Sequence, residues 1–352
     1  MLEPPHHVMD IEGLRLHWVE LGQSTGKPPL VLLHGLNDCY LTWKAIAAAL
    51  GDDRRVLVPD LPGHGLSGRP DASYTLHWYA QVMSRWLDAV GLDNVDVVGH
   101  SFGGGVAQRM LLECPERIRR LVLVSSGGLG REIAVALRLA SIPGVVERFG
   151  QPFMGPGTRL AIKATGDVLS REEIEELSVM NAQSGSARAF ARTVRDIIDW
   201  RGQRQTFFER ANELAQLPAV AVFWGDRDAI IPASHARALA DCLEGCSVTL
   251  FKGCGHYPHH EQPAAFATAL RDFLEDPTAP KARLRDPRTE EPALKLVPSF
   301  FGTARARPLW RKQAQQRAAA SLSQPVIALV PQFRRRLHWI SPERAAKTIP
   351  SG

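Results

Sequence analysis

The sequence predicts an α/β protein built on a mostly parallel sheet with helices on both faces. Short runs rich in Val, Leu and Ile end in Gly, Asp or His, as buried parallel strands do. Helical periodicity follows most of these runs, so strands and helices alternate along the chain. The expected strands are Leu14–Leu21, Leu30–Leu33, Val56–Val58, Val95–Val98, Arg120–Val124, Ala219–Trp224 and Ser247–Phe251, the first of which begins the sheet. The helices expected in the first half are Trp43–Leu50 and Leu76–Val90.

The interval 129–217 interrupts this alternation. It contains three helical patterns, Arg131–Ala140, Arg171–Ala182 and Arg188–Arg201, and no convincing strand. Folds of this class place a lid above the carboxyl ends of their strands, so we interpret the interval as an inserted helical cap. The cap divides the body of the protein into residues 1–128 and 218–276.

Composition predicts a folded, soluble protein without a bound metal or cofactor. Of the 352 residues, 45% are hydrophobic and 22% charged. No stretch reaches the roughly 18–20 apolar residues that span a bilayer, and the first ten residues lack the basic and apolar regions of a signal peptide. The five cysteines form no C-x-x-C pair, which favours free thiols over disulfides or zinc. The cytoplasm is therefore the expected location.

The net charge of +5 is unevenly distributed. Residues 277–352 carry 15 Lys and Arg against 4 Asp and Glu, whereas residues 1–276 carry 27 against 33. Prolines and charges interrupt every periodic run after Glu275, which predicts a basic tail that is largely disordered or loosely helical. Such a tail can be simply solvated, or it can make a weak electrostatic contact with a membrane surface. No nucleic-acid partner is expected.

A serine turn supplies the candidate nucleophile. The segment Gly99-His100-Ser101-Phe102-Gly103 matches G-x-S-x-G and lies between an expected strand and an expected helix. A turn of this kind raises the hydroxyl above the sheet, and its glycines avoid collisions with neighbouring backbone. The helix N-terminus also favours developing negative charge. Ser101 is therefore predicted to attack an acyl carbonyl.

A serine hydroxyl needs a base that is itself held by a third group. His256 follows the last expected strand in the segment GCGH and is the candidate base. Two aspartates follow the strand that ends at Trp224. Asp228 is favoured over Asp226 as the orienting acid, because it precedes the apolar turn and the proline that begin the next helix. The chain order is then nucleophile, acid, histidine.

Two backbone amides are expected to stabilise the negative charge that develops on oxygen. One is the N–H of Phe102, directly after the nucleophile, and the other is the N–H of Leu36, in the sharp turn after LVLL. Seven further residues are expected to contribute to the substrate pocket: His34, Asn37, His100, Phe149, Phe153, Trp200 and Tyr257.

Five segments in order resemble the α/β-hydrolase superfamily over residues 10–275: LVLLHG, DLPGHGLS, GHSFGGG, GDRDAIIP and GCGHYPHHEQP. The chain looks like the cap-bearing serine hydrolase branch, with carboxylesterases, monoacylglycerol lipases and meta-cleavage-product hydrolases. The resemblance implies a mostly parallel, eight-stranded sheet and a Ser-His-Asp triad. Dehalogenases and epoxide hydrolases of the superfamily use an aspartate nucleophile, and this chain has Ser101 at that position.

Ester hydrolysis through an acyl-enzyme is the favoured activity, because aromatic residues of the cap offer apolar surface for an acyl group. Carbon-carbon hydrolysis of the meta-cleavage type stays open, with Arg188 or Arg192 as a partner for a substrate carboxylate. HGLNDC and Tyr257 depart from the HGxGPG loop and the tryptophan of those enzymes. A third alternative is a small-molecule receptor on a hydrolase scaffold. The motifs do not distinguish esters from thioesters or lactones, nor do they define an oligomeric state.

Overall fold

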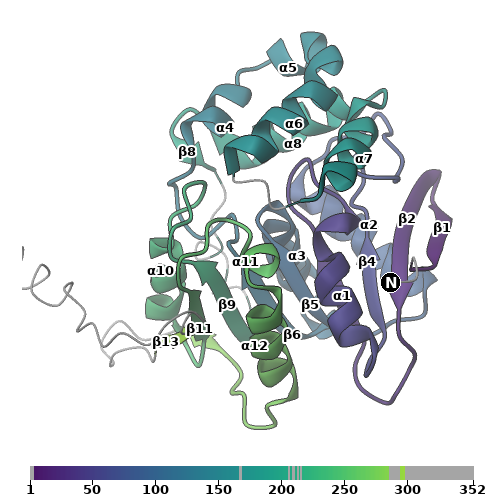
Figure 1. Cartoon of the computed structure of the whole chain (residues 1–352). Helices are drawn as coiled ribbons and strands as arrows, with labels where there is room; N and C mark the ends of the chain where they lie inside the picture. Colours follow the sequence, from purple (N-terminus) through teal and green to yellow (C-terminus); the bar gives the residue numbers. More distant parts are fainter. Residues whose placement is uncertain are drawn as a thin grey trace, which may run out of the picture. The chain divides into compact units, whose positions relative to one another are not determined.

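A nine-stranded sheet with the strand order β1-β2-β4-β3-β5-β6-β9-β11-β13 runs through the core (Figure 1). The computed structural model describes residues 4–165, 169–204, 207, 211, 214, 216–284 and 294–297. The strands of this sheet are β1 (His6–Ile11), β2 (Leu14–Leu21), β3 (Leu30–Leu33), β4 (Val56–Pro59), β5 (Val95–His100), β6 (Ile118–Val124), β9 (Ala219–Gly225), β11 (Ser247–Phe251) and β13 (Leu294–Val297). β2 is antiparallel to both β1 and β4, and the remaining neighbours are parallel. The predicted fold class is confirmed.

Helices cover both faces of the sheet because consecutive residues of each buried strand point to opposite sides. Val31 and Leu33 of β3 join one apolar cluster, and Leu30 and Leu32 join the other. The first cluster includes residues of α2 (Leu76–Ala89), α3 (Phe102–Glu113) and α10 (Ser234–Cys242). The second includes residues of α1 (Lys44–Gly51) and α12 (Pro263–Glu275). Short helices η1 (Tyr40–Trp43), η2 (Pro115–Arg117) and α11 (Pro258–Glu261) lie in the connections.

The structure contains strands before the first and after the last of the predicted ones. The sheet begins with β1, one strand before the predicted start at Leu14, and β1 escaped prediction because most of its residues are exposed or half-buried at the sheet edge. Part of the predicted tail is also structured. β12 (Arg283–Leu284) pairs with β10 (Leu243–Glu244), and β13 pairs with β11. The sequence also predicts that two tail segments, 309–322 and 325–339, could form surface helices on contact with a partner, and both lie outside the described residues.

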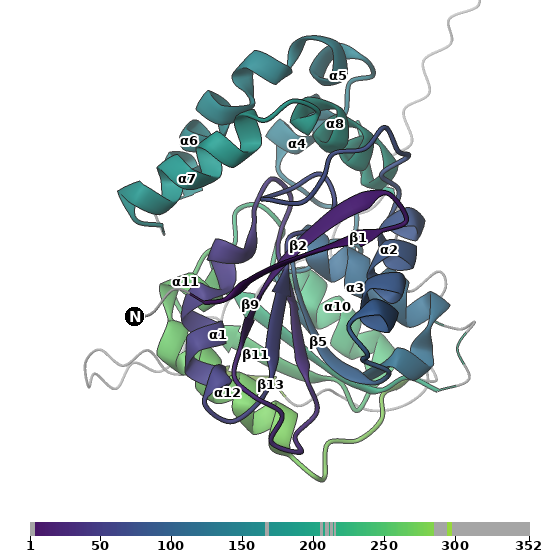
Figure 2. The same cartoon turned by 90° about the vertical axis from the view of Figure 1, so that its right-hand side faces the viewer.

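The interval between β6 and β9 contains the helices of the predicted cap, which lie beyond one end of the strands (Figure 2). They are α4 (Val135–Ala140), α5 (Val145–Phe149), η3 (Gln151–Phe153), α6 (Met154–Thr165), α7 (Arg171–Ala182) and α8 (Ser186–Ile197). The prediction of no strand here was wrong, since β7 (Ile198–Asp199) and β8 (Gly202–Gln203) form a short hairpin that ends the third predicted helix early. Helix α6 was not predicted, because the glycines and the proline of its first residues, MGPG, are poor helix formers. A proline in the first helical turn, however, breaks no internal hydrogen bond.

Candidate active site

The serine turn lies where β5 passes into α3. Ser101 has φ +52° and ψ −115°, a backbone conformation that residues other than glycine rarely adopt. The turn packs tightly against the end of β3. A Cβ atom built on Gly103 would lie 2.4 Å from the carbonyl oxygen of His34 and 2.6 Å from that of Leu33. This geometry is the strand-to-helix turn that the G-x-S-x-G segment predicts.

We expect Gly103→Ala to destabilise the protein by at least about 2 kcal/mol, because the new methyl group would collide with two rigid carbonyl groups. Gly105→Ala is the matched control on the same helix. Its Cβ would meet nothing closer than 3.6 Å, so the substitution should stabilise α3 by roughly 0.5–1 kcal/mol. Urea denaturation of both variants measures the difference. Equal stabilities would show that the turn does not require glycine.

A hydrogen bond joins the predicted base to the predicted acid. His256 Nδ1 and Asp228 Oδ2 are 2.7 Å apart, and both side chains are buried. The other carboxylate oxygen of Asp228 accepts the backbone N–H groups of Ile230 and Ile231, at 2.8 and 2.9 Å. These three hydrogen bonds fix the carboxylate, which in turn places the proton of neutral His256 on Nδ1. Nε2 is then the nitrogen able to accept a proton.

The loop that carries His256 is braced by acids that take no part in this pair. Asp226 is exposed and accepts the N–H of Gly253 at 2.6 Å, so it holds the loop and does not contact the histidine ring. Glu261 accepts the N–H of Gly255 at 2.9 Å. The sequence reasoning missed Glu261, and the signal for it is an acid one turn beyond the histidine, in the segment HHEQP.

His100 joins the serine turn to the histidine loop. Its Nε2 donates to the backbone carbonyl of His256 at 2.9 Å, and the centroids of the two rings are 4.9 Å apart. Its other nitrogen faces Gly35 of the turn after β3, where a Cβ would lie 3.0 Å from Nδ1 and 3.5 Å from Cβ of Ser101. The serine turn, the histidine loop and the turn after β3 therefore meet around His100. The ring of His100 is fully buried beneath them, and its place in the substrate pocket stays a prediction.

His34 is also structural. Its Nδ1 donates to the carbonyl of Gly35 at 2.8 Å, and its Nε2 accepts the N–H of Leu61 at 2.9 Å. Both nitrogens of this fully buried ring are thus occupied by backbone partners, and its place in the substrate pocket stays a prediction. Tyr257 is half-buried, with its ring centroid 4.7 Å from that of His100, and burial raises its pKa.

Asn37 connects the turn after β3 to the cap. Its side chain donates to Thr158 of α6 at 2.9 Å, and Asn181 of α7 donates to its backbone carbonyl at 2.8 Å. The remaining predicted pocket residues point outward: Phe149, Phe153 and Trp200 are 65%, 69% and 74% exposed. These side chains are open to solvent, and their place in the substrate pocket stays a prediction. Phe208, another aromatic residue of the cap interval, lies outside the described residues.

Burial keeps several histidines around this site neutral. Loss of solvent lowers the pKa of His64 to about 3, with a smaller contribution from nearby His34. Burial also lowers the pKa of His34, and it holds the pKa values of His100 and His259 well below the usual range. Each of these residues binds a proton in the unfolded chain near pH 6.5 but only at lower pH in the folded protein.

The protein is therefore expected to lose stability as the pH falls from about 6.5 toward 3, because the unfolded state binds more protons in this window. For His64 alone the loss between pH 6.5 and pH 5 is about 2 kcal/mol. Urea denaturation at pH 7 and pH 5 measures it. His64→Gln should weaken the pH dependence. An unchanged slope in this variant would contradict the assignment.

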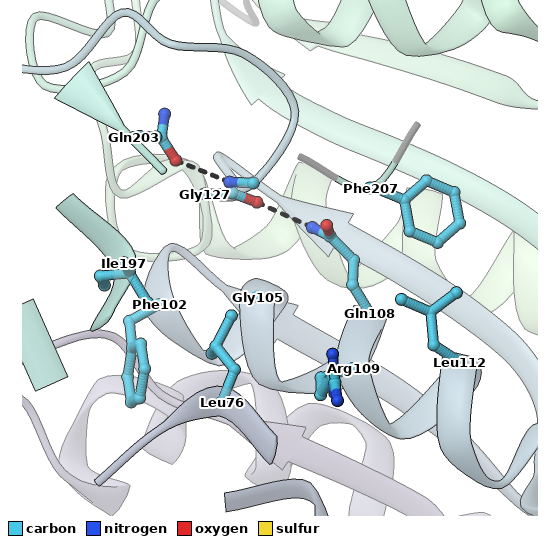
Figure 3. Close-up of a pocket in the computed structure, with 11 residues that line it drawn as sticks. Leu76, Phe102, Gly105, Gln108, Arg109, Leu112, Gly127, Ile197, Gln203 and Phe207 are labelled. Carbon is cyan, nitrogen blue, oxygen red and sulfur yellow. Dashed lines mark hydrogen bonds between the residues drawn. The ribbon is translucent and has the colours of Figure 1, made fainter. Parts of the chain in front are cut away.

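A cavity of about 50 Å³ lies against the face of α3 that carries Phe102, Gly105 and Leu112 (Figure 3). Its wall combines apolar side chains from the core and from the segment that leaves the cap: Leu76, Phe102, Leu112, Ile197 and Phe207. Two glutamines hold its upper edge. Gln108 donates to the carbonyl of Gly127 at 2.7 Å, and Gln203 accepts the N–H of Gly128 at 2.6 Å. The cavity is thus small and mostly apolar, and it runs along α3 from Phe102, the residue after the serine, to Leu112.

Comparisons with known proteins agree with this fold. The pattern of the α/β-hydrolase fold family matches residues 28–263. An uncharacterized protein of Mycobacterium tuberculosis (strain ATCC 25618 / H37Rv) is 33% identical over 263 residues, covering 72% of this chain and 76% of the relative. A 2-hydroxymuconate semialdehyde hydrolase of Pseudomonas sp. (strain CF600) is 31% identical over 261 residues, covering 71% and 88%.

The solved structure of Cfl2 from Burkholderia cenocepacia has the same fold. It superposes with a TM-score of 0.66 at 23% identity, covering 77% of this chain and 95% of the other. Hydrolysis is the chemistry that this family and its neighbours support. The chain therefore belongs to the α/β-hydrolase fold family.

Proposed function

We propose that the protein hydrolyses carboxylic esters of apolar acyl groups through an acyl-enzyme intermediate. The observation that carries the proposal is the buried hydrogen bond of 2.7 Å between His256 and Asp228, on a loop that His100 joins to the strained turn of Ser101. A hydroxyl group is a weak nucleophile at neutral pH, and an oriented imidazole is the group that activates it. Ser101, His256 and Asp228 act as nucleophile, base and orienting acid.

In the first step, Oγ of Ser101 attacks the ester carbonyl while Nε2 of His256 takes its proton. Asp228 stabilises the imidazolium that forms and keeps its ring oriented. The imidazolium then donates the proton to the leaving alkoxide, and the acyl group stays on Ser101. A water molecule, deprotonated by the same nitrogen, attacks the acyl-enzyme and releases the acid.

The N–H groups of Leu36 and Phe102 are assigned as the donors that stabilise the negative charge developing on the carbonyl oxygen. Phe102 is the first residue of α3, where a backbone N–H has no partner within the helix and the helix dipole favours an anion. Leu36 follows Gly35, whose close approach to Ser101 brings this turn to the serine. Donors already in place cost no reorganisation during the reaction, and removing one typically raises the barrier by about 2.7–4 kcal/mol.

The cavity beside α3 supports an apolar acyl group of limited size. Its lining includes the side chain of Phe102, the residue whose amide is assigned to the oxyanion. About 50 Å³ exceeds the roughly 10–15 Å³ that one water requires, and is small for a long acyl chain. Short and medium chains are therefore the proposed substrates.

Carbon-carbon hydrolysis is the second candidate, favoured by the 31% identity to a 2-hydroxymuconate semialdehyde hydrolase. A substrate carboxylate would need a cationic partner. Arg192 already forms ion pairs with Glu147 at 2.9 Å and with Asp71 at 2.6 Å. Arg188 donates to the carbonyl of Arg69, and its buried Nε has no hydrogen-bond partner in the described part of the chain. Arg188 is thus the better of the two arginines for this role.

The two candidates are separated by comparing kcat/KM for p-nitrophenyl esters of increasing chain length with kcat/KM for a 2-hydroxy-6-oxo-dienoate. We expect turnover of short and medium esters, a decline with long chains, and little cleavage of the dienoate. A higher kcat/KM for the dienoate, lost in Arg188→Gln, would replace the ester proposal with the second candidate.

A further inference from the structure

Large exposed apolar side chains are concentrated in one stretch of the cap. Of the eleven large hydrophobic residues that are exposed within the described ranges, seven lie between positions 135 and 160. Figures 1 and 2 both place α5 at the end of the cap away from the sheet. Scattered exposed hydrophobic residues are normal on a soluble protein, but a concentration of them marks an interaction surface. We call these residues the cap patch: Val135, Leu139, Ile142, Val145, Phe149, Phe153 and Leu160.

Helix α5 is oriented with its acid inward and its apolar residues outward. Glu147 contacts Arg192 and Arg195 of α8, each at 2.9 Å, and is only 24% exposed. Val145 and Phe149 of the same helix are 52% and 65% exposed. A surface helix of a soluble protein normally shows the opposite arrangement. The exposed apolar side chains therefore do not serve the packing of the cap, and an external apolar partner is the physical reason for them.

The cation on the exposed face of α5 has no acid beside it that is open to a partner. Between positions 133 and 163 the chain carries four cations, Arg138, Arg148, Arg159 and Lys163, and one acid, Glu147. Arg159 pairs with Glu175 of α7 at 2.6 Å, and Glu147 faces α8. Arg148, which is exposed on α5, is therefore the charge that this helix offers to a partner. A symmetric dimer through the patch would bring Arg148 of two copies into the same interface, without an acid of the patch to pair with them. The charge thus favours an anionic partner over a second copy.

We propose that the cap patch docks the protein on an anionic lipid surface. Phe149 and Phe153 enter the boundary between headgroups and acyl chains, where aromatic rings are stable, and Arg148 contacts lipid phosphates. The contact is peripheral, since no helix within the described ranges has the length and apolarity to cross a bilayer. The proposal concerns binding alone and is independent of the proposed hydrolysis.

The test is co-sedimentation of the full-length protein with phosphatidylcholine vesicles, with and without phosphatidylglycerol. Wild type should bind the anionic vesicles more tightly and lose binding as salt is added. The double variant Phe149→Ser, Phe153→Ser should bind at least about tenfold more weakly. Arg148→Gln should lower binding to the anionic vesicles about fivefold. Val8→Ser with Leu284→Ser, which removes exposed apolar residues elsewhere, should bind like wild type.

Thermal unfolding of each variant controls for folding, and analytical ultracentrifugation reports the oligomeric state. Unchanged vesicle binding of the double phenylalanine variant would overturn the proposal. So would a wild-type dimer that this variant converts to a monomer, because the patch would then be a self-interface. Loss of binding in Arg334→Gln, Arg335→Gln, Arg336→Gln, with binding kept in the phenylalanine variant, would assign the contact to the basic tail instead.

Discussion

Ser101→Ala should lower kcat for a short p-nitrophenyl ester by at least about a thousandfold. The substitution removes the oxygen that attacks the carbonyl, while the amides assigned to the oxyanion stay in place. Rates measured at saturating ester give kcat directly. The variant should fold normally, since alanine tolerates the backbone of Ser101 no worse than serine does.

Ser125→Ala is the matched control for this substitution. Ser125 also has a positive φ, of +43°, and its buried hydroxyl has no hydrogen-bond partner among the residues that the structure describes. Its removal should leave both kcat and the unfolding temperature close to those of wild type. If Ser101→Ala retained more than a tenth of the activity, the acyl-enzyme mechanism would have to be abandoned.

Asp228→Asn should lower kcat by about 10³–10⁴-fold, with little change in the unfolding temperature. The carboxylate accepts the proton on Nδ1 of His256 at 2.7 Å, whereas an amide nitrogen at the same place would donate to that atom. The histidine would then carry its proton on Nε2 and could not accept the proton of Ser101. The effect is on the tautomer, so kcat should fall far more than KM rises.

Asp226→Asn provides the comparison within the same loop. Asp226 is exposed and accepts a single backbone N–H from Gly253, which an amide oxygen can also accept. This variant should keep activity within a few-fold of wild type. A larger loss in Asp226→Asn than in Asp228→Asn would reverse the assignment of the two aspartates.

Local patterns in the sequence were sufficient for much of the fold. A buried strand such as Leu30–Leu33 supplies side chains to both faces of the sheet, so it must be apolar at every position and is conspicuous in the sequence. The serine turn was equally visible, because a turn this tight admits only glycine at the positions that touch backbone. The edge strand β1 has mostly exposed or half-buried side chains, and its pattern carries little of that constraint.

The direction of the cap side chains could not be read from the sequence. Phe149, Phe153 and Trp200 are apolar, and for that reason the sequence predicted them in the substrate pocket. All three are exposed in the structure, and Phe149 is on the outer face of α5 because this helix uses Glu147 to contact α8. Which face of a short helix packs inward depends on its partner, and the partner is chosen by the tertiary fold.

The sequence by itself determined the α/β fold class and the chemistry of the candidate nucleophile, base and acid, because each depends on a few neighbouring residues. Only the tertiary structure decided that His256 bonds to Asp228 rather than to Asp226, and that His100 links the serine turn to the histidine loop. These contacts join residues that are 28 and 156 positions apart. Their geometry depends on how parallel strands align side by side, which no local pattern encodes.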